Sequence, residues 1–384
     1  MRVLGIETSC DDTAVCLLQA EGSFGSDPDA NVGAGFKFRI LGNALSSQAT
    51  LHAQYGGVFP NVAKREHLKN LPILLQQVQK ETAGVKPDVI AVTLGPGLEP
   101  CLWTGITFVQ KLAEELRVPI VAVNHLEGHI IMSMMNIKES QEHSSILQNT
   151  RMMGTIAEFE FPILALLISG GNTQLVLSKE PLQYEAVGKT RDDAAGEAFD
   201  KVARMMELPY PGGPHIAALA KQAREENLSA DIKLPRPMLN EDNLDFSFSG
   251  LKSAVLRFIE SQHQGPSLKN SPRTVLGAEV KMQLAREFEE AVADVLVGKT
   301  LRAVEEYGAS TVVTGGGVSA NTFIRKRLTD ALAEAGAKLL VCPPEFSTDN
   351  AVMIALAGYF HALKKEFAEP TTLTASGNLT LDSG

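Results

Sequence analysis

Cysteine is scarce and scattered in this sequence. The four cysteines, Cys10, Cys16, Cys101 and Cys342, show no CxxC spacing, and two of them lie in runs typical of buried strands. Disulfide frameworks and cysteine zinc sites both need a regular set of closely spaced cysteines. The sequence therefore argues against a disulfide-stabilised scaffold and against a cysteine-based zinc module.

Net positive charge and long apolar runs are also lacking. The 35 basic and 45 acidic residues give a formal charge of −10, which excludes a histone-like binder and leaves only local basic patches for nucleic acid. The longest apolar runs, such as 161–168, are far shorter than the roughly 18 residues that cross a bilayer. Met1 leads directly into a strand pattern without a leader sequence. We expect a cytoplasmic protein without a membrane partner.

The chain does contain a repeated α/β pattern. Its 384 residues exceed one comfortable core, so we expect two lobes. Apolar runs on both sides of the polar turn at 7–13 predict a β-hairpin, and 161–178 predicts a second one. Strand patterns followed by helix patterns begin near 88, 118 and 310. The sequence predicts an α/β protein with mixed sheets covered by helices.

Polar segments set the expected boundaries of the lobes. Residues 21–35 and 136–158 have loop-like compositions and are expected to be surface insertions. The tail at 368–384 has little to bury and is expected to be flexible. The expected division is an N-terminal lobe of 1–124 with 350–367 and a C-terminal lobe of 125–349.

Glycine clusters indicate where a phosphate could bind. Four clusters each follow a predicted strand: Gly95-Pro96-Gly97, Ser169-Gly170-Gly171, Pro211-Gly212-Gly213-Pro214 and Gly315-Gly316-Gly317. Such turns allow close backbone approach and offer free N–H groups. No GxxxxGK[ST] or GxGxxG motif occurs, which disfavours P-loop and dinucleotide-binding folds. Any single cluster is equally well explained as an ordinary turn, but together they favour a nucleotide cleft.

A histidine pair indicates a metal site. His125 and His129 stand at i and i+4, on one face of a predicted helix and about 6 Å apart, so they could share one ion. Glu127 is displaced by one position from the glutamate of HExxH, which disfavours a metallopeptidase. Two buried structural histidines remain an equal alternative on this pair alone. Asp349 opens a helix after a predicted strand and is the candidate third ligand.

Local charge clusters are less specific. Asp200 shares a helix face with Glu197, either as a functional pair or as a solvated face. The basic clusters at 64–69 and 325–327 are candidate phosphate contacts, with solvated surface as the ordinary alternative.

Ten motifs follow one another in order from Met1 to about Phe367. They lie at 5–13 (GIETSCDDT), 52–67, 95–98 (GPGL), 124–129 (NHLEGH), 169–173 (SGGNT), 192–201, 210–214, 246–252 (FSFSGLK), 316–321 (GGVSAN) and 347–350 (STDN). In these motifs the sequence resembles the TsaD family, bacterial tRNA N6-adenosine threonylcarbamoyltransferases once labelled glycoproteases. Asn61, Lys64 and Asn172 depart from the bacterial pattern.

The resemblance implies a fold, a reaction and a set of site residues. The implied fold is the actin-like ATPase (ASKHA) fold, with two lobes of duplicated mixed-sheet subdomains around a nucleotide cleft. The implied reaction moves the threonylcarbamoyl group from threonylcarbamoyl-AMP to N6 of adenosine 37 in tRNAs that read codons beginning with adenine. One divalent ion per subunit, Fe²⁺ with zinc or magnesium as alternatives, is implied at His125, His129 and Asp349. The residues implied to contact the adenylate are Leu167, Ile168, Ser169, Gly170, Gly171, Asp200, Gly213 and Asn321.

The turn of the first hairpin supplies the candidate catalytic residues, Asp11 and Ser9. The adenine amine is a poor nucleophile, so Asp11 is expected to act as a general base or as an orienting group. Implied partners are tRNA through its anticodon loop, a TsaB-like paralogue and a TsaE-like ATPase. Two alternatives stay open: a non-catalytic paralogous subunit, which would lack the metal residues, and a small-molecule kinase on the same fold, which would not need the paired histidines.

Overall fold

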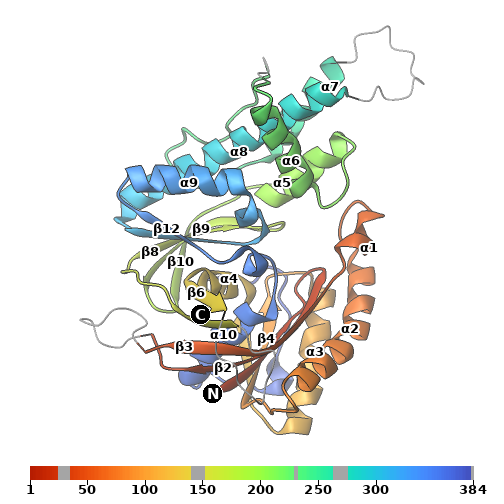
Figure 1. Cartoon of the computed structure of the whole chain (residues 1–384), viewed down its shortest axis with the longest axis vertical. Helices are drawn as coiled ribbons and strands as arrows, with labels where there is room; N and C mark the ends of the chain where they lie inside the picture. Colours follow the sequence, from red (N-terminus) through yellow and green to blue (C-terminus); the bar gives the residue numbers. More distant parts are fainter. Residues whose placement is uncertain (25–34, 140–151, 229–231, 263–275, 382–384) are drawn as a thin grey trace.

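The computed structural model describes residues 1–24, 35–139, 152–228, 232–262 and 276–381, which form two lobes (Figure 1). Each lobe is built on one mixed sheet. The strands of the first sheet have the order β5-β4-β1-β2-β3-β7-β6, and those of the second have the order β10-β9-β8-β11-β12. Their bounds are β1 Arg2–Glu7, β2 Asp12–Glu21, β3 Lys37–Ser47, β4 Val89–Gly95, β5 Ile120–Asn124, β6 Met135–Glu139, β7 Met152–Ile156, β8 Ile163–Ile168, β9 Thr173–Glu180, β10 Gln183–Lys189, β11 Thr311–Gly315 and β12 Lys338–Val341.

The second sheet repeats the topology of the first. β1 and β8 each form an antiparallel hairpin with the next strand, and a third antiparallel strand follows, β3 or β10. On the other side, β4 and β5 extend the first sheet in parallel, as β11 and β12 extend the second. The two predicted hairpins and the α/β class are therefore confirmed. Parallel strands end at the same edge of a sheet, so each lobe gathers its loops there.

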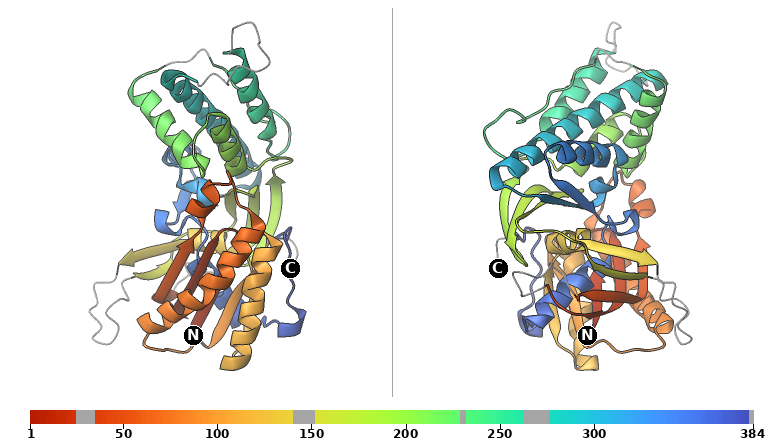
Figure 2. Two further views of the ribbon diagram at one scale, coloured as in Figure 1. Left: turned by 90° about the vertical axis from the view of Figure 1, so that its right-hand side faces the viewer. Right: turned by 60° about the vertical axis from the view of Figure 1, so that its left-hand side comes forward.

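Helices alternate with the sheets in layers (Figures 1 and 2). Their bounds are α1 Ala49–Ala53, α2 Pro60–Glu81, α3 Glu99–Leu116, α4 His125–Ser133, α5 Ala195–Met205, α6 Gly212–Glu225, α7 Ser249–Ser261, α8 Ala278–Tyr307, α9 Thr322–Glu334 and α10 Ala351–Leu363. Helices α2 and α3 cover the outer face of the first sheet, and α5 to α9 pack over the second. Helices α4 and α10 lie in one apolar core with the facing sides of both sheets.

Alternation along β1 explains these layers. Val3 faces the central core with α4 and α10, whereas Leu4 and Ile6 face the core with α2 and α3. Period-two alternation of apolar residues on both faces is what a doubly covered strand requires. Helix α10 is apolar around almost its whole circumference, as expected for a helix between two sheets. Among the described residues, no helix combines the length and apolarity needed to span a membrane.

Gly5 lets α10 approach the first sheet closely. A Cβ atom at this position would lie 2.3 Å from the carbonyl oxygen of Ala351, the first residue of α10. Only glycine avoids that clash with backbone, which cannot move aside as a side chain can. The contact fixes where α10 begins, and therefore where Asp349, two residues earlier, is held.

The predicted loop at 136–158 is partly wrong. β6 and β7 form a hairpin at the edge of the first sheet, where Lys37, Phe38 and Arg39 of β3 pair with β7. This part of the chain thus belongs to the N-terminal lobe, and not to the C-terminal lobe as expected from the boundary at 124. The outermost strand, β6, packs Met135 and Ile137 on the central core but exposes Asn136, Lys138 and Glu139, so its composition resembles that of a loop. Residues 25–34 and 140–151 of the predicted insertions lie outside the described residues.

The prediction of a flexible tail is wrong for residues 368–381. This segment follows the ends of β4 and β5: the backbone N–H of Ser376 donates to Leu94 at 2.9 Å, and the Asn124 side chain donates to the carbonyl of Thr380 at 3.0 Å. Leu373 is 4% exposed. Composition missed the order because backbone hydrogen bonds, rather than apolar side chains, hold most of the segment. Residues 382–384 are outside the described residues.

Candidate metal centre

Two helix starts position the candidate metal ligands. His125 directly follows β5 and opens α4, whose first turn is capped by the Asn124 side chain at 2.9 Å. His129 stands one turn later on the same face. Asp349 precedes Asn350, whose side chain caps α10 at 3.0 Å. The sequence thus fixes each ligand next to a capped helix terminus, where the backbone is well determined.

The three side chains converge on one point. Asp349 Oδ1 lies 3.3 Å from His125 Nε2 and 3.2 Å from His129 Nε2, and the three possible ligand atoms all lie within 4.8 Å of one another. The imidazole rings stand nearly perpendicular, at 89°. Two imidazole nitrogens and a carboxylate oxygen are a donor set that holds one divalent ion. The three ligands predicted from sequence are therefore brought together, although Asp349 comes 220 residues after His129.

Glu7, which sequence reasoning did not single out, holds the first ligand. Its side chain is fully buried at the end of β1, and Oε2 lies 3.1 Å from Nδ1 of His125. The Thr93 hydroxyl donates to the same oxygen at 2.7 Å, and the backbone N–H of Ser9 donates to Oε1. A carboxylate on Nδ1 fixes the tautomer that leaves Nε2 free for a metal. The only signal in the sequence was an acid inside a strand that is otherwise apolar.

The charges at this point favour a bound cation. Burial opposes charge on His125, but Asp349 and Glu7 outweigh it and hold its pKa well above the ordinary value. Burial is also outweighed at Asp349, where the two histidines hold the carboxyl pKa below its usual range. For His129 burial prevails and lowers the pKa. The buried carboxylate of Glu7 and the half-buried carboxylate of Asp349 thus face one shared proton on His125, which a divalent ion can replace.

Glu127 does not belong to the metal cluster. It points toward α10, where its Oε2 lies 2.7 Å from Nε2 of His361, and the side chain is buried. A zincin-type general base would have to face the ion. The geometry therefore agrees with the sequence argument against a metallopeptidase.

The candidate catalytic residues lie in the turn between β1 and β2. Ser9 is buried, and its carbonyl oxygen accepts the backbone N–H of Leu98 at 2.7 Å. Asp11 is half-buried; burial raises its pKa, and the charge of Asp349 raises it further. In the other lobe, burial raises the pKa of Asp200 and of Tyr210, and the charge of Asp11 raises both further. The charge of Asp11 is therefore felt by groups of both lobes.

The residues predicted to contact an adenylate fall into two groups. The side chains of Leu167 and Ile168 are buried in cores on opposite faces of the second sheet, so only their backbone can meet a ligand. The following turn, Ser169 to Gly171, is partly exposed and lies against Gly196 and Gly316. A Cβ atom on either of these two glycines would clash with the chain at 168–170.

The remaining three residues, Asp200, Gly213 and Asn321, belong to the starts of two helices, α6 and α9. Asp200 accepts the backbone N–H of Gly212 at 2.7 Å, so it fixes the first turn of α6, which contains Gly213. Asn321 caps α9, accepting the backbone N–H groups of Phe323 and Ile324 at 3.0 Å each. Both helix N-termini are thus capped by oxygen atoms of the chain's own side chains.

The two basic clusters, at 64–69 and 325–327, differ in their contacts with the rest of the protein. Arg325 donates to the carbonyl of Ser319 and Arg327 pairs with Asp294, whereas Lys326 pairs with Asp330 at the surface. The phosphate contact at 325–327 stays a prediction. Lys64 and Arg65 on α2 are exposed and have no hydrogen-bond or ion-pair partner among the described residues.

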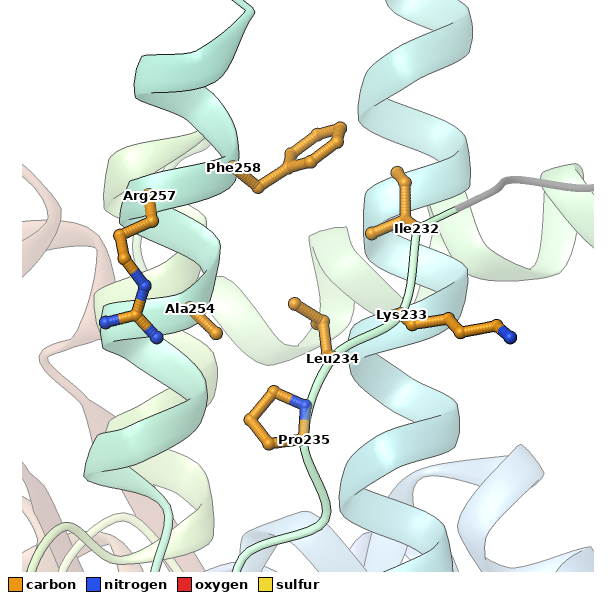
Figure 3. A pocket seen from close by; sticks show the side chains of 7 residues that line it. All are labelled: Ile232, Lys233, Leu234, Pro235, Ala254, Arg257 and Phe258. Carbon is orange, nitrogen blue, oxygen red and sulfur yellow. The ribbon is translucent and has the colours of Figure 1, made fainter.

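A separate hollow of about 690 Å³ lies between α7 and residues 232–235 (Figure 3). It is lined by Ile232, Lys233, Leu234, Pro235, Ala254, Arg257 and Phe258. None of the predicted site residues lines it, so it is not part of the metal centre.

The duplicated sheets, with loops gathered around a His-His-Asp cluster between them, define a protein of the actin-like ATPase fold class with a candidate metal centre. HypF of T. kodakarensis has this fold at a TM-score of 0.50 and 15% identity, with 95% of this chain and 48% of that chain covered. The family model for TsaD, tRNA N6-adenosine threonylcarbamoyltransferase, matches residues 39–356. The chain belongs to the TsaD family.

Curated relatives with the same name as the family model match this chain over nearly their full length. A tRNA N6-adenosine threonylcarbamoyltransferase of Thermosipho africanus (strain TCF52B) is 38% identical, covering 99% of this chain and 100% of its own. The protein of the same name from Desulfitobacterium hafniense (strain Y51) is 41% identical, covering 99% and 98%. The expected family, fold and enzyme class are thereby confirmed.

We expect Glu7→Gln to weaken metal binding by about 10- to 100-fold, because the carboxylate that orients His125 is lost while the three ligands stay. The measurement is a titration with Co²⁺ followed by its visible absorption. Glu127→Gln is the matched control, since it neutralises another buried glutamate, in the first turn of α4, that faces His361 and not the cluster. Equal Co²⁺ affinity in the two variants would contradict the orienting role of Glu7.

His361 should make stability depend on pH. Burial lowers its pKa, but the facing carboxylates Glu127 and Glu366 outweigh this and raise the pKa to about 9. The Tyr184 phenol, which lies near Glu127, stays neutral because burial raises its pKa. A raised pKa stabilises the fold fully below the unfolded value near 6.5, and this stabilisation is lost as pH rises through about 9.

The expected size of this effect is about 1–3 kcal/mol in the free energy of unfolding between pH 6.5 and 9. Urea unfolding of the wild-type chain and of His361→Gln at several pH values measures it, and the difference between the two isolates His361 from other titrating groups. Parallel pH curves for the two proteins would show that the buried pair does not stabilise the fold.

Proposed function

We propose that this chain transfers the threonylcarbamoyl group from threonylcarbamoyl-AMP to N6 of adenosine 37 in tRNAs that read codons beginning with adenine. The observation that carries the proposal is the convergence of His125, His129 and Asp349 beside Asp11. A non-catalytic paralogous subunit would not need these ligands, and a small-molecule kinase would not need the histidines. The relatives that match the chain over its whole length bear the name of this transferase.

The adenylate of the donor would lie against the turns of the second lobe. Backbone N–H groups of Gly170 and Gly171 would meet its phosphate, since the N–H of Ser169 already donates to the carbonyl of Asn172 and Leu167 and Ile168 would contribute backbone only. Asp200 supports this by holding Gly212, and hence Gly213, in place. Asn321 borders the same region at the start of α9.

The ion proposed at His125, His129 and Asp349 is Fe²⁺, with zinc or magnesium as alternatives. Two imidazole donors support iron or zinc over magnesium, which prefers oxygen ligands. When bound there, a divalent ion would polarise the threonylcarbamoyl carbonyl as a Lewis acid. The side chain of Leu167 is 1% exposed in the core and carries no donor, so this chain offers three ligands and leaves positions for substrate.

Asp11 is proposed to move the proton. The bond from N6 to the carbonyl carbon forms, the bond from that carbon to the phosphate oxygen breaks, and AMP leaves with the electron pair. The proton of the amine passes to a carboxylate oxygen of Asp11, whose raised pKa makes it a better base than an exposed aspartate. Ser9 is buried, so its part is to hold the turn that carries Asp11, through its contact with Leu98.

The proposed partners are the tRNA anticodon loop, a TsaB-like paralogue and a TsaE-like ATPase, and the tRNA substrate implies a cytoplasmic site of action. Exposed large apolar side chains support a protein partner on α1 to α3, the helices that face the viewer at the left of Figure 2. They are Tyr55, Phe59, Leu68, Ile73 and Trp103, each at least 40% exposed. Such exposure on helices of a water-facing layer is typical of a protein interface.

The transfer is tested by mass spectrometry of nucleosides from unmodified tRNA incubated with the chain, threonylcarbamoyl-AMP and the TsaB-like paralogue. We expect threonylcarbamoyladenosine with the wild-type chain, none with His125→Ala, and a rate lower by about 100-fold or more with Asp11→Ala. Glu127→Gln serves as the control that keeps the reaction. Wild-type turnover by His125→Ala, or no product with the donor intact and the partner bound, would refute the proposal.

The partner surface is tested by sedimentation of the chain with the purified TsaB-like paralogue. Ile73→Lys and Trp103→Glu should weaken the complex by about 10-fold or more, because they place charge in a desolvated contact. Leu363→Lys, which changes an equally exposed leucine on α10, should leave binding intact. Loss of binding in the Leu363 variant alone would place the partner elsewhere.

A further inference from the structure

A buried carboxylate on α8 connects three helices of the second lobe. The side chain of Glu289 is fully buried, and its Oε1 accepts the side-chain amide of Asn321 at 2.6 Å. Its Oε2 pairs with the Arg224 guanidinium of α6 at 2.5 Å. That guanidinium also lies 3.9 Å above the ring of Phe323 in α9. Glu289 is thus the common acceptor between α6, α8 and α9.

These contacts determine how the Asn321 amide points. Its Oδ1 accepts two backbone N–H groups at the start of α9, and its Nδ2 donates to Glu289. Both ends of the amide are therefore bound, so neither rotation nor a flip is available without breaking a hydrogen bond. Asn321 ends the glycine-rich turn that follows β11, so the same contacts fix that turn.

Stability alone does not explain a charge in this position. Burial raises the pKa of Glu289 even though Asn321 and Arg224 act against it, so the cost of desolvation is not fully offset. Apolar side chains of similar volume commonly replace a buried ion pair without loss of stability. The rest of α8 is already packed on an extensive apolar core. A buried carboxylate is needed, by contrast, to orient two donors at once.

We propose that Glu289 is a positioning residue for the adenosine monophosphate part of the donor, and that it acts by orienting Asn321 and the turn before α9. This inference rests on the proposed function, in which Asn321 borders the adenylate. Arg224 neutralises the charge of Glu289 and fixes the position of its second carboxylate oxygen, Oε2. Replacement of Glu289 by glutamine turns one acceptor oxygen into an N–H donor, so either Asn321 or Arg224 then faces a donor and the amide of Asn321 loses its fixed direction.

The test compares Glu289→Gln with Glu287→Gln. Glu287 lies two residues earlier on α8 and pairs with Arg236 at 2.5 Å, but it has no contact with Asn321. AMP binding is measured by isothermal titration calorimetry, transfer by steady-state kinetics, and folding by thermal unfolding. For Glu289→Gln we expect AMP binding weaker by about 10-fold and a donor KM raised similarly. Its kcat and Co²⁺ affinity should stay near wild type, and Glu287→Gln should bind AMP normally.

A second variant keeps the proposal testable if Glu289→Gln is poorly folded. Asn321→Ser retains a helix-capping hydroxyl but cannot reach Glu289, so it should lose AMP affinity while the fold is kept. If Glu289 acts through Asn321, the double variant should bind AMP no more weakly than Asn321→Ser alone.

Three results would overturn the inference. They are wild-type AMP affinity and KM in Glu289→Gln, equal losses in the Glu287 and Glu289 variants, and additive losses in the double variant. Failure of the proposed function would look different, because the wild-type chain itself would then neither bind AMP nor form threonylcarbamoyladenosine.

Discussion

The site depends on two carboxylates brought to the same buried point by different parts of the chain. Glu7 ends the first strand, Asp349 precedes the last long helix, and His125 lies between them with 3.1 Å to one and 3.3 Å to the other. Such a pair of negative charges is costly to bury unless a cation is shared between them. The first turns of α4 and α10 must therefore meet at this point, and the close approach of α10 to Gly5 makes that possible.

The duplicated topology explains why the two lobes contribute different chemistry. The five strands of the second sheet have the same order as β5-β4-β1-β2-β3 of the seven-stranded first sheet, so each sheet presents loops at the carboxyl ends of its parallel strands. In the first lobe these loops carry Glu7, Asp11 and the start of α4. In the second lobe the equivalent positions carry the 169–171 turn and the glycines after β11. One architecture thus offers the candidate acid–base group and metal ligands in one lobe and the candidate phosphate-binding turns in the other.

Local patterns in the sequence predicted the two hairpins, the α/β class and the three metal ligands, since each depends on spacing along one element or on the turn after a strand. Glu7 and Glu289 could not be found in this way, because their partners His125, Arg224 and Asn321 are distant in sequence. The pairing of Arg327 with Asp294 was invisible for the same reason. Composition also missed the order of residues 368–381, which main-chain hydrogen bonds hold.

The exposure of the three ligands argues for an ion that acts on substrate and against a purely structural one. The histidine side chains are 7% and 2% exposed, whereas Asp349 is 23% exposed, so the cluster reaches solvent mainly through Asp349. Among the described residues no fourth His, Cys, Asp or Glu joins the set. Structural metal sites are closed by four protein ligands, and catalytic sites keep a position free. The open side is therefore where a substrate oxygen would complete the coordination.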